Sequence, residues 1–291
     1  MCKEVEIICF GVGFGDCIYI KLPNNIQLLI DTGHNGAFLD VMNKLISEER
    51  NIDYVFLTHS HGDHIGGISQ LLDNTELRIK GIYYWTPIDT KISKTNLVKI
   101  EKLRDISVNK HRMIHCEQLD EEVIERMYSI FEQYINILFP ITCNIHEYST
   151  TDLNANSIVI DVVIEGYHFL FMGDATSANE EMIICECAKK GIDLKKTVFW
   201  KIGHHASETA SSNAFLNAII GADFKKAICS CKESWTRTID NNEPPSVSKI
   251  DEINLKLASL GEKINFTGES CTRRDIKLKF RFNEGNVTYV H

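Results

Sequence analysis

The segment YVFLTHSHGDHIGG, residues 54–67, constrains the fold more than any other part of the chain. Within this segment, an apolar run is followed by four side chains of metal-ligand type, and then by paired glycines. These four are His59, His61, Asp63 and His64. In an extended segment, side chains at positions i, i+2 and i+4 share one face. We therefore predict that His59, His61 and Asp63 converge at the end of a buried strand.

The next residues predict a turn into a helix, which gives His64 a different direction. Gly62, Gly66 and Gly67 allow this turn because they have no Cβ. One short loop can in this way supply ligands to two adjacent metal ions. The alternative, a polar surface loop with surplus histidines, accounts less well for this spacing after a buried strand.

Length and charge narrow the classes of protein. The 291 residues are 44% hydrophobic, enough to bury a sizeable core, and we predict a single domain over residues 1–291. The formal net charge of -9 disfavours binding to nucleic acid through a broad basic face, although a local patch would suffice.

The ten cysteines are scattered, and many lie inside apolar runs, which is typical of reduced, buried thiols in a cytoplasmic protein. The opening segment MCKEVEIICF alternates like a strand and does not resemble a signal peptide. No apolar run approaches the length of a membrane span, so no membrane association is expected. The sequence does not indicate an oligomeric state.

Strand and helix patterns mix along the whole chain and predict an α/β fold. The glycine loop GVGFGD is followed by a strand pattern rather than a helix, which favours a tight hairpin over a dinucleotide site. Residues 91–140 are predicted to be a mostly helical insertion beside the core. Its clearest helix is DEEVIERMYSIFEQYINILF, with Asp120 as N-cap.

The histidine segment resembles the signature of the metallo-β-lactamase superfamily, which implies an αββα four-layer sandwich. Further motifs agree in the same order. The resemblance implies that Asp31 of LLIDTG is a buried orienting acid and that Asp174 of FLFMGDA bridges both metals. In WKIGHHAS it implies His204 as the last ligand, with His205 as its neighbour or a proton donor, and Ser207 near the substrate or behind the ligands.

A narrower resemblance is to the C-terminal hydrolase domain of the competence protein ComEC and its stand-alone relatives. It rests on GVGFGD, where Asp16 either joins the site or only caps a turn, and on NANSIVI. Many superfamily members have another histidine before the bridging aspartate, and this chain has none there. An amide oxygen of Asn154 or Asn156 would fill that position and would shift the preference from zinc toward manganese.

The resemblance implies a metal-dependent hydrolase with two divalent metal ions, zinc or manganese. Metal ions lower the pKa of bound water, so a metal-bound hydroxide would attack the substrate. Asp63 would ligate one ion and orient this nucleophile, and His205 would protonate the leaving group. The ligands implied are His59, His61, Asp63, His64, Asp174 and His204.

The narrower resemblance favours a phosphodiesterase or nuclease acting on DNA or RNA. A small phosphodiester such as a cyclic nucleotide, or a lactone or thioester, remains an alternative, as does an inactive metal-stabilised binding module. The other histidines that we considered have no ligand spacing and are predicted to serve surface or packing roles: His34, His111, His115, His146 and His168. The basic run Arg273–Arg274 is either a solvated face or a nucleic-acid contact.

Overall fold

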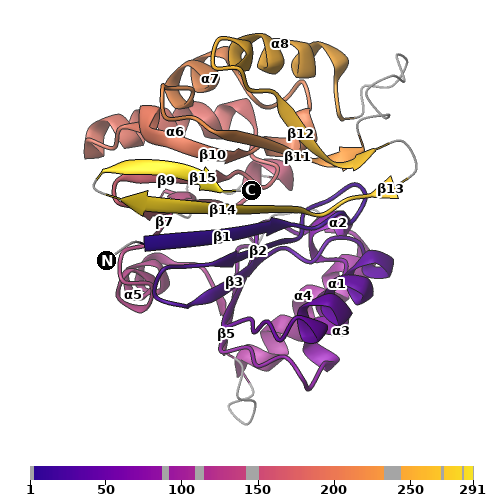
Figure 1. Cartoon of the computed structure of the whole chain (residues 1–291). Helices are drawn as coiled ribbons and strands as arrows, with labels where there is room; N and C mark the ends of the chain where they lie inside the picture. The colour runs from indigo at the N-terminus through magenta and orange to yellow at the C-terminus, as the bar shows by residue number, and fades with distance from the viewer. Residues whose placement is uncertain are drawn as a thin grey trace.

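The computed structural model describes residues 3–86, 92–108, 115–141, 151–232, 244–269, 272–283 and 285–290. Two mixed β-sheets pack face to face, and helices cover the outer face of each (Figure 1). This arrangement confirms the predicted four-layer α/β sandwich. Within the described residues, no helix is long and apolar enough to cross a lipid bilayer.

The first sheet has eight strands in the order β15-β14-β1-β2-β3-β4-β5-β6. Strands β3 to β6 are parallel to one another, whereas the pairs from β15 to β3 are antiparallel. The strands are β1 (Lys3–Cys9), β2 (Ile18–Lys21), β3 (Gln27–Ile30), β4 (Tyr54–Leu57), β5 (Gly81–Tyr84), β6 (His115–Gln118), β14 (Ile276–Asn283) and β15 (Asn286–Val290).

The second sheet has seven strands in the order β13-β12-β11-β10-β9-β8-β7. Its central strands β9 to β12 are parallel, and the outer pairs are antiparallel. The strands are β7 (Ile135–Phe139), β8 (Val159–Ile164), β9 (Tyr167–Phe171), β10 (Thr197–Lys201), β11 (Lys226–Lys232), β12 (Ile264–Glu269) and β13 (Thr272–Arg273).

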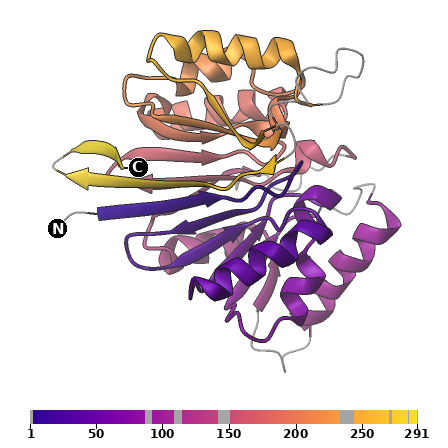
Figure 2. The ribbon, with the colours of Figure 1, turned by 45° about the vertical axis from the view of Figure 1, so that its right-hand side comes forward.

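Helices α1, α3 and α4 lie against the first sheet, and α6, α7 and α8 lie against the second (Figures 1 and 2). The α-helices are α1 (Asn35–Ser47), α2 (Gly62–Ile65), α3 (Ile68–Asp73), α4 (Lys94–Val108), α5 (Glu121–Ile130), α6 (Ser177–Lys190), α7 (Asn213–Ile219) and α8 (Val247–Ala258). Short 3-10 turns are η2 (Asn154–Asn156), η3 (Leu194–Lys196) and η4 (Gly203–Ala206).

Alternation along the strands explains why the first sheet is covered on both faces. In β1, Ile7 joins the core that fills the space between the sheets, while Ile8 joins the core beneath α1 and α3. Successive side chains of a strand point to opposite faces, so an apolar strand of this kind requires cover on both sides. The seven described cysteines form no disulfide, and all except Cys185 are buried, as predicted for reduced thiols.

The prediction of a mostly helical insertion over residues 91–140 is wrong. The segment contributes α4 and α5, but β6 forms the edge of the first sheet and β7 the edge of the second. Asp120 is the N-cap of α5, as predicted, and accepts a hydrogen bond from Val123 N at 2.8 Å. The helix ends at Ile130 because Glu132 and Gln133 have positive φ, and the alternating run INILF then forms β7.

Candidate metal centre

The candidate ligands follow the carboxyl ends of parallel strands in both sheets. Asp31 comes directly after β3, and His59 and His61 follow β4. Asp174 follows β9, and the GHHA turn follows β10. Strands β3 and β4 are parallel, as are β9 and β10, so in each sheet the polar loops lie at the same end of the strands. The side chains of these loops meet where the strand ends of the two sheets lie next to each other.

Two groups of potential ligands share Asp174. In the first group, donor atoms of His59, His61 and Asp174 all lie within 4.8 Å of one another. The second group consists of Asp63, His64, Asp174 and His205, whose ligand atoms also all lie within 4.8 Å of one another. His61 is the N-cap of α2, so Asp63 turns with this helix and joins His64 rather than His59. One loop thus supplies both groups. The predicted convergence of Asp63 with His59 and His61 is wrong, because the extended backbone ends at His61 and Asp63 lies in the helix.

Distances within the groups are those of side chains that face a common point. His59 Nε2 lies 3.6 Å from Asp174 Oδ2, and His64 Nε2 lies 3.3 Å from Asp174 Oδ1. His205 Nε2 lies 3.4 Å from the same Asp174 Oδ1 and 3.6 Å from Asp63 Oδ2. Asp174 is itself fixed by its backbone N–H, which donates to Ser157 Oγ at 3.0 Å.

Asp31, which the resemblance implied to be an orienting acid, is fully buried beside His64. Its Oδ2 lies 2.7 Å from His64 Nδ1, and its Oδ1 accepts a hydrogen bond from Thr58 N at 2.7 Å. Thr58 Oγ1 also donates to Asp31 Oδ2 at 2.6 Å. With Nδ1 of His64 engaged, Nε2 is the nitrogen that faces the cluster.

The structure places His205, not His204, among the candidate ligands. The residues His204, Ala206 and His205 have φ of 43°, 62° and 46° respectively, so the turn after β10 is left-handed over three successive side chains. This conformation directs His205 into the cluster, where the residue is completely buried, and leaves His204 only partly buried. The prediction of His204 as the last ligand, with His205 as proton donor, is therefore wrong. His205 lies where the last ligand was expected.

His204 instead belongs to a hydrogen-bonded group beside the cluster. Its Nε2 lies 3.1 Å from Asn154 Nδ2, and its Nδ1 lies 2.8 Å from Thr209 Oγ1. Ser207 Oγ lies 3.1 Å from the same Thr209 Oγ1, so Ser207 supports this group without touching the candidate ligands. Within the described part of the chain, Asn154 Oδ1 is buried without a hydrogen-bond partner, and Asn156 is also buried.

Asp16 forms a buried ion pair behind the second group. Its Oδ2 lies 2.8 Å from Lys201 Nζ, and both side chains are almost fully buried. A carboxylate oxygen of Asp16 also lies within 4.8 Å of donor atoms of Asp31 and His64. Burial would lower the pKa of Lys201, but the carboxylate of Asp16 outweighs it and raises this pKa. Asp16 therefore joins the surroundings of the site and does more than cap a turn.

Charge states in the cluster suit a divalent cation. Burial would raise the pKa of Asp174, yet the neighbouring charges of His64 and His205 hold it well below its ordinary value. Burial lowers the pKa of His59 well below its ordinary value, which leaves this imidazole neutral with a free lone pair. His64 behaves differently, because three carboxylates outweigh its burial and raise its pKa. Binding of a cation would displace such a proton.

The glycine loop between β1 and β2 packs directly on the cluster. Gly15 has a φ of 121°, and a Cβ at this position would overlap the carbonyl oxygen of Asp63. The ring of Phe14 lies over His205, with 4.2 Å between ring centroids. The sequence predicted a tight hairpin for this loop but did not indicate Phe14, Thr58 or Lys201 as neighbours of the site. Their position directly beside a motif residue is the signal that could have found them.

The other histidines take no part in these groups where the structure describes them. His168 Nδ1 lies 2.8 Å from Asp161 Oδ2 inside the core, which fits the predicted packing role. His34 is the N-cap residue of α1. His111 and His146 lie outside the described residues, as does the side chain of His115.

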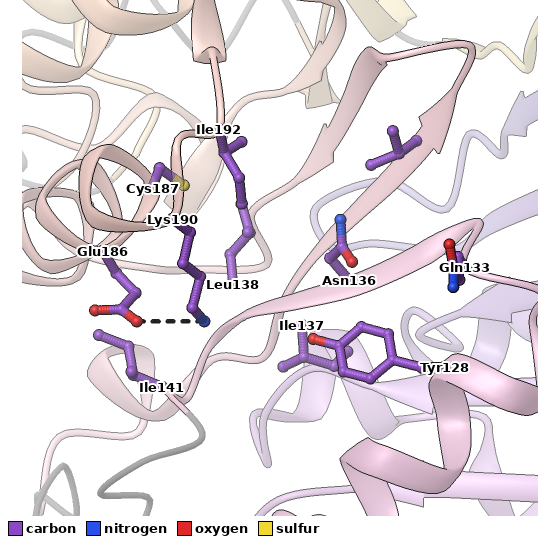
Figure 3. Close-up of a pocket in the computed structure, with 11 residues that line it drawn as sticks. Tyr128, Gln133, Asn136, Ile137, Leu138, Ile141, Glu186, Cys187, Lys190 and Ile192 are labelled. Atoms are coloured by element: carbon purple, nitrogen blue, oxygen red, sulfur yellow. Dashed lines mark ion pairs between the residues drawn. The ribbon is translucent and has the colours of Figure 1, made fainter.

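A separate pocket of about 580 Å³ lies between β7 and the C-terminal part of α6 (Figure 3). Tyr128 and Ile137 line one side, and Cys187 lines the other. Lys190 and Glu186 form an ion pair at 3.3 Å on its wall. None of the candidate ligands lines this pocket, so it is distinct from the metal centre.

Comparisons with known proteins agree with this geometry. Residues 10–99 match the family model described as the metallo-beta-lactamase superfamily. An uncharacterized protein of Methanocaldococcus jannaschii is 28% identical over 124 residues, covering 42% of this chain and 44% of that protein. An atrochrysone carboxyl ACP thioesterase of Cryptosporiopsis is 34% identical over 115 residues, covering 37% of this chain and 36% of the enzyme. The chain thus spans less than half the length of these two relatives.

A hydroxyacylglutathione hydrolase of Serratia proteamaculans is 25% identical over 167 residues, covering 46% of this chain and 64% of that enzyme. Among solved structures, the metallo hydrolase Igni18 from Ignicoccus hospitalis has a TM-score of 0.50 at 13% identity, covering 96% of this chain and 100% of that one. That likeness concerns the fold alone. The matched segment, the fold and the histidine–aspartate groups are thus all similar to those of metal-dependent hydrolases of the metallo-β-lactamase superfamily.

Proposed function

We propose that this protein hydrolyses phosphodiesters, in DNA or RNA, with two divalent metal ions. The observation that supports this most directly is the sharing of Asp174 by two groups of potential ligands. Two metals bridged by one carboxylate form the arrangement in which both the attacking and the leaving oxygen of a displacement can be stabilised.

The residues present fit such ions. His64 Nε2, Asp174 Oδ1 and His205 Nε2 are buried and have no hydrogen-bond partner among the described residues. Buried polar atoms of this kind are costly unless something else satisfies them. Imidazole nitrogens and carboxylate oxygens are ligands that suit zinc and manganese. His59, His61 and Asp174 would hold one ion, and Asp63, His64, His205 and Asp174 the other.

When bound, divalent ions supply Lewis-acid activation of water and of the scissile phosphoryl oxygen. The protein itself contributes the remaining parts. Asp31 holds the orientation of His64, and Phe14 packs against His205. His204 lies outside both ligand groups, and its contacts with Asn154 and Thr209 hold it where a substrate would meet the cluster.

The choice of substrate rests on the resemblance to competence-type hydrolases, carried by GVGFGD and NANSIVI. The net charge of -9 fits a small phosphodiester better than a long duplex. Thioester hydrolysis is a second candidate, since two of the similar proteins are named as a thioesterase and as a hydroxyacylglutathione hydrolase.

Hydrolysis of bis(p-nitrophenyl) phosphate, with manganese or zinc added, tests the proposal. We expect turnover by the wild type and none by His61→Ala at matched folding. A hydroxyacylglutathione thioester assayed in parallel separates the candidates. Turnover of the thioester alone would overturn the phosphodiester assignment, and turnover of neither would favour the metal-stabilised binding module.

A further inference from the structure

Arg273 lies beside the glycine loop that contacts the metal centre. It ends β13, and a Cβ at Gly13 would lie 4.0 Å from Arg273 Nε. The next residue of the loop, Phe14, packs on His205 with 4.2 Å between ring centroids. Only one residue of the loop, Gly13, therefore separates Arg273 from the aromatic ring that covers a candidate ligand.

Backbone contacts fix the segment that carries Arg273 beside this loop. Gly11 N donates to Asp275 Oδ1 at 2.9 Å, and a Cβ at Gly11 would lie 2.5 Å from Arg274 N, so the loop and this segment touch. Arg274 N also donates to Thr267 O of β12 at 2.8 Å. The backbone at position 273 is thus held in place although its side chain is exposed.

Electrostatics connect Arg273 with the cluster. Burial lowers the pKa of His34, and the charges that act on this residue include those of both Asp63 and Arg273. His34 therefore lies within electrostatic reach of the second ligand group and of Arg273. No ion pair joins Arg273 to a carboxylate among the described side chains. A guanidinium in this position is available to an anion that arrives with the substrate.

We propose that Arg273 binds a second phosphate of the substrate, next to the scissile one, and so selects oligonucleotides over isolated phosphodiesters. This inference rests on the proposed function and extends it to a substrate class. Arginine suits the role because its planar guanidinium donates two parallel hydrogen bonds to a phosphate. The neighbouring Arg274 side chain lines a different pocket, with Lys263 and Lys277, so the two arginines point away from each other.

The test compares Arg273→Gln with wild type on two substrates, with manganese present. The first is bis(p-nitrophenyl) phosphate, which has only the scissile phosphate, and the second is a single-stranded oligothymidylate. We expect KM for the oligothymidylate to rise about tenfold, kcat to change less than about twofold, and the first substrate to be unaffected. Arg273→Lys should restore part of the affinity.

Arg78→Gln is the matched control, because it removes the same charge at the opposite end of the first sheet, just before β5. An unchanged KM in Arg273→Gln, or an equal loss on both substrates, would overturn the role of Arg273. Wild-type activity on bis(p-nitrophenyl) phosphate without activity on the oligothymidylate would also overturn it. Wild-type turnover of neither substrate would instead refute the proposed function, and this inference with it.

Discussion

The two histidine loops present their candidate ligands by different physical means. After β4, Asp31 holds His64 through a hydrogen bond of 2.7 Å, and Thr58 holds Asp31 through bonds of 2.6 and 2.7 Å; the backbone of His64 is regular. After β10, both ring nitrogens of His205 lack a hydrogen-bond partner among the described residues. His205 is held instead by a left-handed turn and by the ring of Phe14.

This difference explains why the first loop could be predicted in part and the second was assigned wrongly. The rule that side chains at i and i+2 share a face applies to extended backbone, so it holds for His59 and His61 but not for Asp63, which lies in α2. A left-handed turn of non-glycine residues is rare and costs energy at each position. The sequence GHHA does not predict a left-handed turn, so His204 was chosen as the ligand instead of His205.

Asp174 connects the two loops, so its removal should have the largest effect. We expect Asp174→Ala to lose both ions and to reduce kcat by more than about a hundredfold. This exceeds the loss of about 10–100-fold that is typical when a hydrogen-bond partner of a metal ligand is removed. Elemental analysis of dialysed protein, with circular dichroism as the folding control, checks this. Retention of one tightly bound ion would show that the two groups do not depend on a common ligand.

Asp31→Asn should weaken the loop that relies on hydrogen bonds. The amide removes the negative charge next to His64 Nδ1, and loss of such a partner lowers metal affinity by about 10–100-fold. Metal titration of Asp31→Asn measures this loss. Phe14→Leu is the comparison for the other loop and should cost less, because it removes packing and no hydrogen bond to His205. Equal losses would contradict the distinction between the loops.

The first ligand group has two imidazoles, and we expect it to bind its ion more weakly than the second. Asn154 Oδ1 is buried and has no hydrogen-bond partner among the described residues, so this amide oxygen is available as a further ligand. Asn154→Ala should therefore lower the metal affinity of the first group only, by about tenfold or less. Asn156→Ala should leave this affinity unchanged. Calorimetric titration with manganese resolves the two affinities. Two equally tight sites in the wild type would contradict this prediction.

The smallest effect is expected for Ala206→Gly. Ala206 has a φ of 62° and is fully buried. Glycine relieves about 1–2 kcal/mol of strain at such a position but loses a buried methyl group of about 0.8 kcal/mol and gains freedom in the unfolded chain. We therefore expect the free energy of unfolding to change by less than about 1 kcal/mol. A larger loss in urea denaturation would show that packing, rather than backbone conformation, determines this turn.

The layers and the loop that carries the first histidines could be predicted from the sequence because each depends on a local pattern. Alternating apolar residues give the strands, and the spacing of His59, His61, Asp63 and His64 gives the loop. The segment 91–140 was misjudged because the apolar side of α5 continues into the apolar strand β7 and only a short turn with positive φ separates them. The pairing of Asp16 with Lys201 depends on two distant strand ends that only the fold brings together.

Comparison of His205→Ala with His204→Ala tests the central assignment most directly. Both variants remove one imidazole from the same turn, so each controls for the other. We predict that His205→Ala loses the ion of the second group, together with more than about a hundredfold in kcat. His204→Ala should retain the metal content of the wild type. Loss of metal in His204→Ala, with normal metal content in His205→Ala, would contradict the assignment.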